Sequence, residues 1–212
     1  MIRGYALVLS LGVIAAAICA GWYSTTRVVY FPPALFEQSV DCGANGGGRW
    51  PVIDEYEADW FGQELRAFDE PSLYRASLDG VAAERSLRFT WLRSFRDPIV
   101  VRIDRLADGG AGLVARQRSG GRRPGAQTRE LSRRLTPVEV RDLDTVLGRA
   151  ALPGQPARNC PLGTDGARWI IESVEPSTGY TYLNRWSPED GPVREVGLHM
   201  LGLTGWRIAD VY

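Results

Sequence analysis

The chain contains no lysine, and all 25 of its basic residues are arginine, as the codon usage of a GC-rich genome would produce. The absence of lysine excludes a phosphate-binding loop at the glycine cluster of residues 43–50, because such a loop needs a lysine followed by serine or threonine. The single histidine, His199, excludes a zinc site built from several histidines. With 25 acidic residues the net charge is zero, which argues against nucleic-acid binding.

Motifs that assemble a catalytic site are also absent. The sequence has no His-Glu-x-x-His, Gly-x-Ser-x-Gly or Cys-x-x-Cys motif, and it has no dinucleotide-binding fingerprint. We expect His199 to be a half-buried structural residue on the flank of the last helix. The sequence therefore predicts no metal and no cofactor, and it favours a non-enzymatic protein.

The length of 212 residues suits one globular domain behind a membrane anchor. Residues 4–23 carry no charge, and Arg3 precedes them. About 20 apolar residues span a bilayer, and aromatic residues such as Trp22 and Tyr23 are typical of its interface. A cleaved secretory signal is the alternative, since small residues at 15–17 could form its cleavage site. We favour an uncleaved anchor over residues 1–23, and both alternatives export the rest of the chain.

Three cysteines are present. Cys19 lies within the apolar segment, and Ile18 before it is larger than the residue that precedes a lipidated cysteine. This leaves Cys42 and Cys160, which we expect to form a disulfide in an oxidising compartment. The expected location is the bacterial inner membrane, crossed once, with the C-terminal domain in the periplasm. After signal cleavage the protein would instead be periplasmic or secreted.

The sequence divides into an anchor at 1–23, a tether with a Pro/Gly-rich loop at 24–52, and one extracytoplasmic α+β domain at 53–212. Apolar residues at helical spacing predict helices over 54–70, 136–151 and 187–201. Thr136, Pro137 and Glu139 predict a capping box at the start of the second helix. Alternating segments joined by glycine-containing loops predict a four-strand antiparallel meander and a C-terminal hairpin. These strands are expected at residues 87–93, 99–105, 113–118, 128–135, 168–174 and 180–186.

Six segments carry a resemblance, and they lie at residues 70–73, 88–93, 101–103, 165–172, 185–188 and 190–197. Together they resemble an uncharacterised family of bacterial exported or membrane-anchored proteins. The resemblance covers roughly residues 60–205 and implies a common fold and a location in the cell envelope. Ser173 stands where such proteins often have glycine. The resemblance implies no activity, so it assigns no functional residue.

The predicted C-terminal hairpin carries the candidate binding surface. A five-residue loop places Glu172 opposite Tyr182 and Arg168 opposite Trp186, with Asn184 on the same face. A carboxylate, a guanidinium, an amide and aromatic rings together are typical of a surface that binds sugars or peptides. Alternatively, this face belongs to the core and Glu172 pairs with an arginine.

Charge is distributed unevenly along the chain. Residues 28–84 contain eleven acidic residues and three arginines, whereas residues 85–134 contain thirteen arginines and four acidic residues. We expect the basic strands to pair with the acidic helical region inside the protein. The alternative is a basic surface that faces anionic lipid headgroups next to the anchor.

The sequence favours a non-enzymatic, membrane-anchored envelope protein whose domain binds or scaffolds a periplasmic protein or a cell-wall component. A periplasmic immunity or inhibitor protein would have the same organisation. The enzymatic alternative is a cell-wall hydrolase with Glu172 as acid and Asp165 or another acidic residue as base, which requires both carboxyls in a cleft. The sequence makes no prediction of the oligomeric state.

Overall fold

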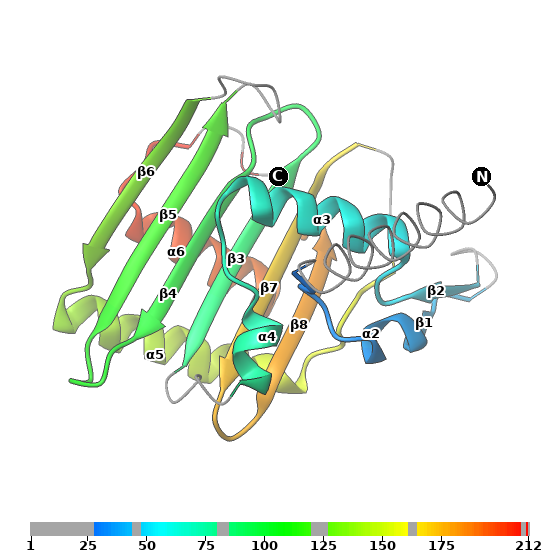
Figure 1. Cartoon of the computed structure of the whole chain (residues 1–212), viewed down its shortest axis with the longest axis horizontal. Coiled ribbons are helices and arrows are strands. Elements are labelled where there is room, and N and C mark those ends of the chain that lie inside the picture. Colours follow the sequence, from blue (N-terminus) through cyan, green and yellow to red (C-terminus); the bar gives the residue numbers. More distant parts are fainter. Residues whose placement is uncertain are drawn as a thin grey trace, which may run out of the picture.

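The structure is a computed structural model that describes residues 28–43, 48–79, 85–119, 127–160, 165–208 and 211. Among these residues no helix is both long enough and apolar enough to cross a membrane. The expected anchor at residues 1–23 lies outside the described residues. The described chain forms the predicted α+β domain, with an antiparallel six-stranded sheet and helices on both of its faces (Figure 1).

The sheet has the strand order β6-β5-β4-β3-β7-β8. The first four strands in sequence form the predicted meander, and the C-terminal hairpin adds beside β3 through antiparallel pairing with β7. Within the meander β3–β6 each strand pairs with its predecessor, as the sequence pattern indicated, whereas β7 pairs with β3 and not with β6. The strands are β3 (Ser86–Arg93), β4 (Ile99–Arg105), β5 (Ala111–Ser119), β6 (Gln127–Arg134), β7 (Ala167–Glu175) and β8 (Gly179–Trp186).

One face of the sheet is apolar and packs on α5 (Pro137–Ala150) and α6 (Pro192–Leu203). Alternate residues of β3, such as Phe89 and Trp91, point to this side and are completely buried. The predicted capping box begins α5: Thr136 Oγ1 accepts the backbone N–H of Glu139, and the Glu139 side chain accepts the N–H of Thr136.

The opposite face is covered over β3, β7 and β8 by α3 (Glu55–Ala67) and the short α4 (Leu73–Leu78), which lie in front of the sheet in Figure 1. Phe61 and Leu65 of α3 pack in the same apolar cluster as Ile170 and Tyr182 of the sheet. The molecule therefore has helices on both faces, and the front layer covers only part of its face.

Residues 28–52, which we expected to be a tether, pack against this front layer in the parts that the structure describes. They form α2 (Ala34–Glu37) and a two-stranded hairpin of β1 (Ser39–Asp41) and β2 (Arg49–Pro51). Tyr30 and Phe31 are buried in the same apolar cluster as α3. Proline and glycine in this segment suggested a flexible linker, but its aromatic residues supply part of the core.

The predicted disulfide between Cys42 and Cys160 is present, with the two Cα atoms 5.6 Å apart. It ties the β1–β2 hairpin to the segment that follows the 3₁₀ turn at Leu152–Gly154. That segment lies along the edge of β8, where the N–H of Asn184 donates to the carbonyl of Ala157. A structural disulfide indicates an extracytoplasmic location, because such bonds persist in oxidising compartments.

Candidate functional site

Between the sheet and the front helices lies a layer of buried arginines and carboxylates. The arginines come mainly from the strands, and two of the carboxylates, Glu57 and Glu70, come from α3 and the residues that follow it. The expected internal pairing between the basic strands and the acidic helical region is present at Glu70, whereas Glu57 pairs with arginines outside residues 85–134. Burying a charge costs free energy unless the charge is paired and hydrogen-bonded. The helices can therefore pack over the sheet only because these charges are paired.

Glu70 is positioned by the way α3 ends. The helix ends at Ala67 with Phe68 as its C-cap, and the next residue, Asp69, adopts the left-handed conformation with φ of 55°. The N–H of Asp69 then donates to the carbonyl of Arg66, and the N–H of Glu70 donates to that of Leu65, which is the Schellman pattern. This reversal directs Glu70 under the helix, and Pro71 prevents the helix from continuing.

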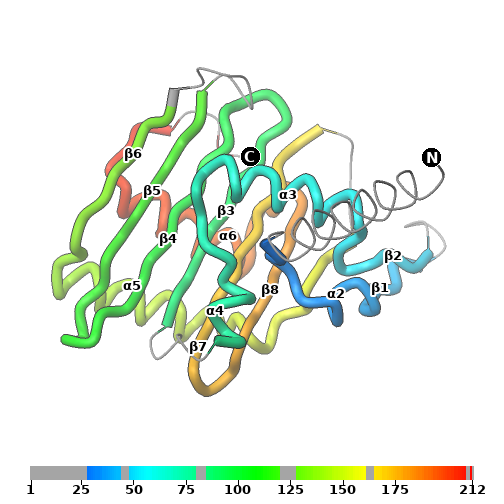
Figure 2. The backbone as a smooth tube through the Cα atoms, viewed as in Figure 1, coloured from blue at the N-terminus to red at the C-terminus, as the bar shows by residue number. Residues whose placement is uncertain are grey.

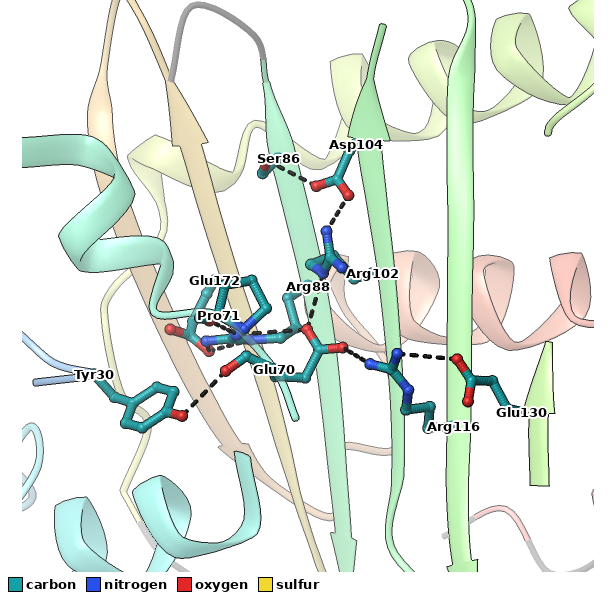
Figure 3. A network of polar contacts seen from close by, with 10 residues as sticks. All are labelled: Tyr30, Glu70, Pro71, Ser86, Arg88, Arg102, Asp104, Arg116, Glu130 and Glu172. Atoms are coloured by element: carbon teal, nitrogen blue, oxygen red, sulfur yellow. Dashed lines mark hydrogen bonds and ion pairs between the residues drawn. The ribbon is translucent and has the colours of Figure 1, made fainter. Parts of the chain in front are cut away.

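Three arginines from adjacent strands converge on the Glu70 carboxylate (Figure 3). Arg102 Nε and Arg116 Nη1 each donate to it at 2.9 Å, and Arg88 Nη1 lies 3.7 Å away. The backbone carbonyl of Glu70 also accepts a hydrogen bond from the Tyr30 hydroxyl at 3.1 Å. The Glu70 carboxylate thus connects β3, β4 and β5, and the Glu70 backbone carbonyl binds the N-terminal segment through Tyr30.

Glu172 on β7 is the second carboxylate of this network. Its Oε2 accepts hydrogen bonds from Arg88 Nε at 2.9 Å and Nη2 at 2.6 Å, and its Oε1 accepts one from the Tyr180 hydroxyl at 2.8 Å. Burial on its own lowers the pKa of Arg88, but Glu172 and Glu70 beside it raise that pKa above its usual value. The guanidinium therefore stays charged. Burial and the Glu172 charge raise the pKa of Tyr180 well above its usual range, which keeps its proton in place as a donor.

Glu57 in α3 forms a second cluster nearer the disulfide. Its two oxygens accept hydrogen bonds from Arg158 Nη1 at 2.6 Å and from Arg168 Nη2 at 2.8 Å. The Arg168 guanidinium also lies over the Trp186 ring, 4.8 Å from its centroid. Burial lowers the pKa of Arg168, although the Glu57 charge opposes the shift. Asp54 caps α3 by accepting the N–H of Glu57, and this bond holds Glu57 in the first turn.

The hairpin register predicted from the sequence is confirmed, with Glu172 opposite Tyr182 and Arg168 opposite Trp186. Asn184 lies on the same face. This face packs beneath the front layer, however, so Glu172, Tyr182 and Asn184 are almost inaccessible to solvent, whereas Arg168 and Trp186 are half-buried. Burial raises the pKa of Tyr182. Asp165, the base in the hydrolase alternative, is exposed, whereas Glu172 is enclosed in an ion pair.

Some buried polar atoms of this face have no hydrogen-bond partner among the described residues. They include the Tyr182 hydroxyl and both side-chain polar atoms of Asn184, which follow one another along β8. His199 is half-buried, as expected, and its Nε2 is also unpartnered within the described part of the chain. In those same ranges no cluster of histidine, cysteine and acidic residues could hold a metal ion.

Sequence reasoning did not identify the partners of the predicted residues. The residues it missed are Glu57, Glu70, Arg88, Arg102, Arg116 and Arg158. The only sequence signal for them was the separation of acidic and basic stretches, which indicated pairing between regions without indicating which residues pair.

Beside this covered layer, no helix among the described residues lies over β5 and β6 on the same face of the sheet (Figure 1). On β5, Val114 and Arg118 are partly accessible, and on β6, Thr128, Ser132 and Arg134 are exposed. β6 is also the last strand of the sheet on this side. The two halves of one face therefore differ: a covered half held by buried ion pairs, and an open polar half that ends in an edge strand.

Comparison with known proteins gives no further assignment. The chain matches no protein family and no curated protein sequence.

Proposed function

We propose that the protein is a non-enzymatic, membrane-anchored envelope protein whose periplasmic domain binds or scaffolds a partner, which is a protein or a cell-wall component. The anchor is residues 1–23, crossing the bacterial inner membrane once. The uncharged segment of residues 4–23 agrees with this proposal, and so does the disulfide between Cys42 and Cys160.

The observation that carries the proposal is the division of the polar sheet face. In the covered half, Glu57, Glu70 and Glu172 form ion pairs, so these carboxylates stabilise the fold. The open half on β5 and β6 presents polar and charged side chains on a rigid sheet, and β6 is the edge strand of that sheet in the described part of the chain. A rigid, accessible surface of this kind suits recognition of a partner.

The cell-wall hydrolase is less well supported. A general acid must reach the bond that it protonates. Glu172 is 1% exposed and accepts two hydrogen bonds from Arg88, so its carboxyl cannot approach a glycan without opening of the front layer.

In-cell photocrosslinking of the full chain tests the proposed binding surface. A photoreactive amino acid at Ser132, on the open half, should give a discrete product of higher mass. The matched control is the same amino acid at Val138, an exposed position on α5 behind the sheet. Products of equal yield from both positions, or from neither, would contradict the proposal.

A second set of experiments tests the membrane location of the protein and the hydrolase alternative, independently of partner binding. External protease added to spheroplasts should remove the domain, and the protein extracted from membranes should have the intact mass with residues 1–23 included. Purified full chain should release no soluble fragments from peptidoglycan. Fragment release by the wild type that is lost in Glu172→Gln, with circular dichroism showing that the variant is folded, would establish the hydrolase instead.

A further inference from the structure

An apolar groove of about 830 Å³ lies on the outer side of the front layer, between the first described residues and α3. Figure 2 shows this start of the chain, in blue, beside α3 in cyan. Val28, Val29 and Phe36 line the groove and are 45%, 45% and 38% exposed. Three large apolar side chains that share one groove and remain accessible to solvent mark a surface that contacts something apolar.

The position of the groove along the chain indicates what that contact is. The uncharged segment of residues 4–23 ends five residues before Val28. Because an extended chain advances at most about 3.6 Å per residue, Val28 at the groove lies within about 18 Å of the end of that segment. If residues 4–23 span the membrane, the groove is held at the membrane surface.

The charged residues at the groove indicate which lipid headgroup could bind there. Glu37 and Glu55 line it, and neither forms an ion pair with another described residue. Asp59 and Arg66, which also line it, lie 4.0 Å apart. The excess of negative charge repels anionic headgroups and favours a headgroup that carries an ammonium.

We propose that this groove is the membrane-facing surface of the domain and that it binds a zwitterionic phospholipid with an ethanolamine headgroup. The acyl chain contacts Val28, Val29 and Phe36, and the ammonium pairs with Glu37 and Glu55. This inference rests on the membrane anchor of the proposed function. It adds a defined orientation, in which α3 and the N-terminal segment face the bilayer and the apolar-face helices α5 and α6 face away.

The test uses the full chain in nanodiscs of phosphatidylethanolamine that contain a phospholipid with a photoreactive acyl chain. After illumination, mass spectrometry of the digested protein maps the adducts. We expect adducts within residues 4–23 and at residues 28–36. The matched controls are Val138 of α5 and Leu198 of α6, which are exposed apolar residues on the opposite side of the sheet and should remain unlabelled.

Two variants test whether labelling at residues 28–36 depends on the apolar side chains and the charge of the groove. Phe36→Asp should lower labelling of residues 28–36 by about tenfold, because it removes most of an apolar contact, and should leave labelling of residues 4–23 unchanged. Glu37→Lys should shift the preferred lipid from phosphatidylethanolamine to phosphatidylglycerol. Both side chains are exposed, and circular dichroism should confirm that the variants fold.

The outcomes distinguish the two proposals. Adducts within residues 4–23 without adducts at 28–36 would overturn the groove inference and leave the anchor in place. Absence of adducts from both segments would overturn both proposals. In a separate sample, a photoreactive amino acid at Phe36 that links to residues 4–23 or to a second copy of the chain would show that protein fills the groove and would also overturn the inference.

Discussion

Arg88 and Glu172 lie directly opposite each other on β3 and β7, with Nη2 and Oε2 2.6 Å apart and almost no exposure to solvent. Removal of one partner from such a pair leaves a buried charge without compensation. We therefore expect Glu172→Gln to lower the free energy of unfolding by about 3–5 kcal/mol in denaturant titrations. The matched control is Asp108→Asn, which breaks the exposed pair with Arg134 and should change this free energy little.

The same pair gives a second prediction when both charges are removed. Arg88→Met combined with Glu172→Leu should be more stable than either single variant, because no uncompensated charge remains. Glu70 keeps Arg102 and Arg116 in this double variant. Equal losses that simply add in the double variant would show that the two side chains do not interact.

The disulfide between Cys42 and Cys160 closes a loop of 118 residues. In the chain-entropy description, closing a loop of this length stabilises the folded state by about 4–5 kcal/mol. We expect reductant, or Ser at both positions, to lower the melting temperature measured by circular dichroism. Cys19→Ser is the control and should melt like the wild type. An unchanged melting temperature in reductant would contradict a stabilising role.

Local signals explain which parts of the fold could be predicted. The capping box at Thr136 and the register of Glu172 against Tyr182 follow from neighbouring residues and from the length of one turn, and both are confirmed. The helix α4 has only six residues, too few for a periodic pattern, and was missed. The pairing of Arg88 with Glu70 and Glu172 depends on how the helical layer sits on the sheet, which local patterns do not encode.

The candidate binding surface shows the same difference between features that local sequence determines and features that tertiary packing determines. Strand alternation placed Arg168, Glu172, Tyr182 and Asn184 on one face, but it could not show which layer covers that face. The covering layer includes Tyr30 and Phe31, which lie in the segment that composition suggested was a tether. Burial of a surface depends on the whole fold. The predicted strand register was therefore correct, but most of the residues that it grouped are buried and not accessible.

Glu139 predicts a pH dependence. Hydrogen bonds from Arg133 and from the backbone of Thr136 lower its pKa to about 2. Since this carboxyl has a lower pKa in the folded state, its stabilisation is complete above about pH 4.5 and is lost as the pH falls towards 2. Solvent screens this partly exposed group, so we expect a contribution of at most about 1 kcal/mol. Unfolding curves at several pH values should show a shallower acid dependence for Glu139→Gln than for the wild type, and superimposable profiles would contradict this.

Two glycines of α6 should respond in opposite ways to alanine. A Cβ at Gly197 would lie 2.8 Å from atoms of the Trp169 ring and 2.9 Å from Phe89, both buried in the core. We expect Gly197→Ala to destabilise the fold by about 1–3 kcal/mol, because the rings cannot move apart without disturbing the packing. Gly202 has no atom within 4 Å of its Cβ position, so alanine there should stabilise the helix by about 0.5–1 kcal/mol. Denaturant titration of both variants checks the pair: stabilisation by Gly197→Ala would show that α6 does not pack on the sheet as closely as the structure has it.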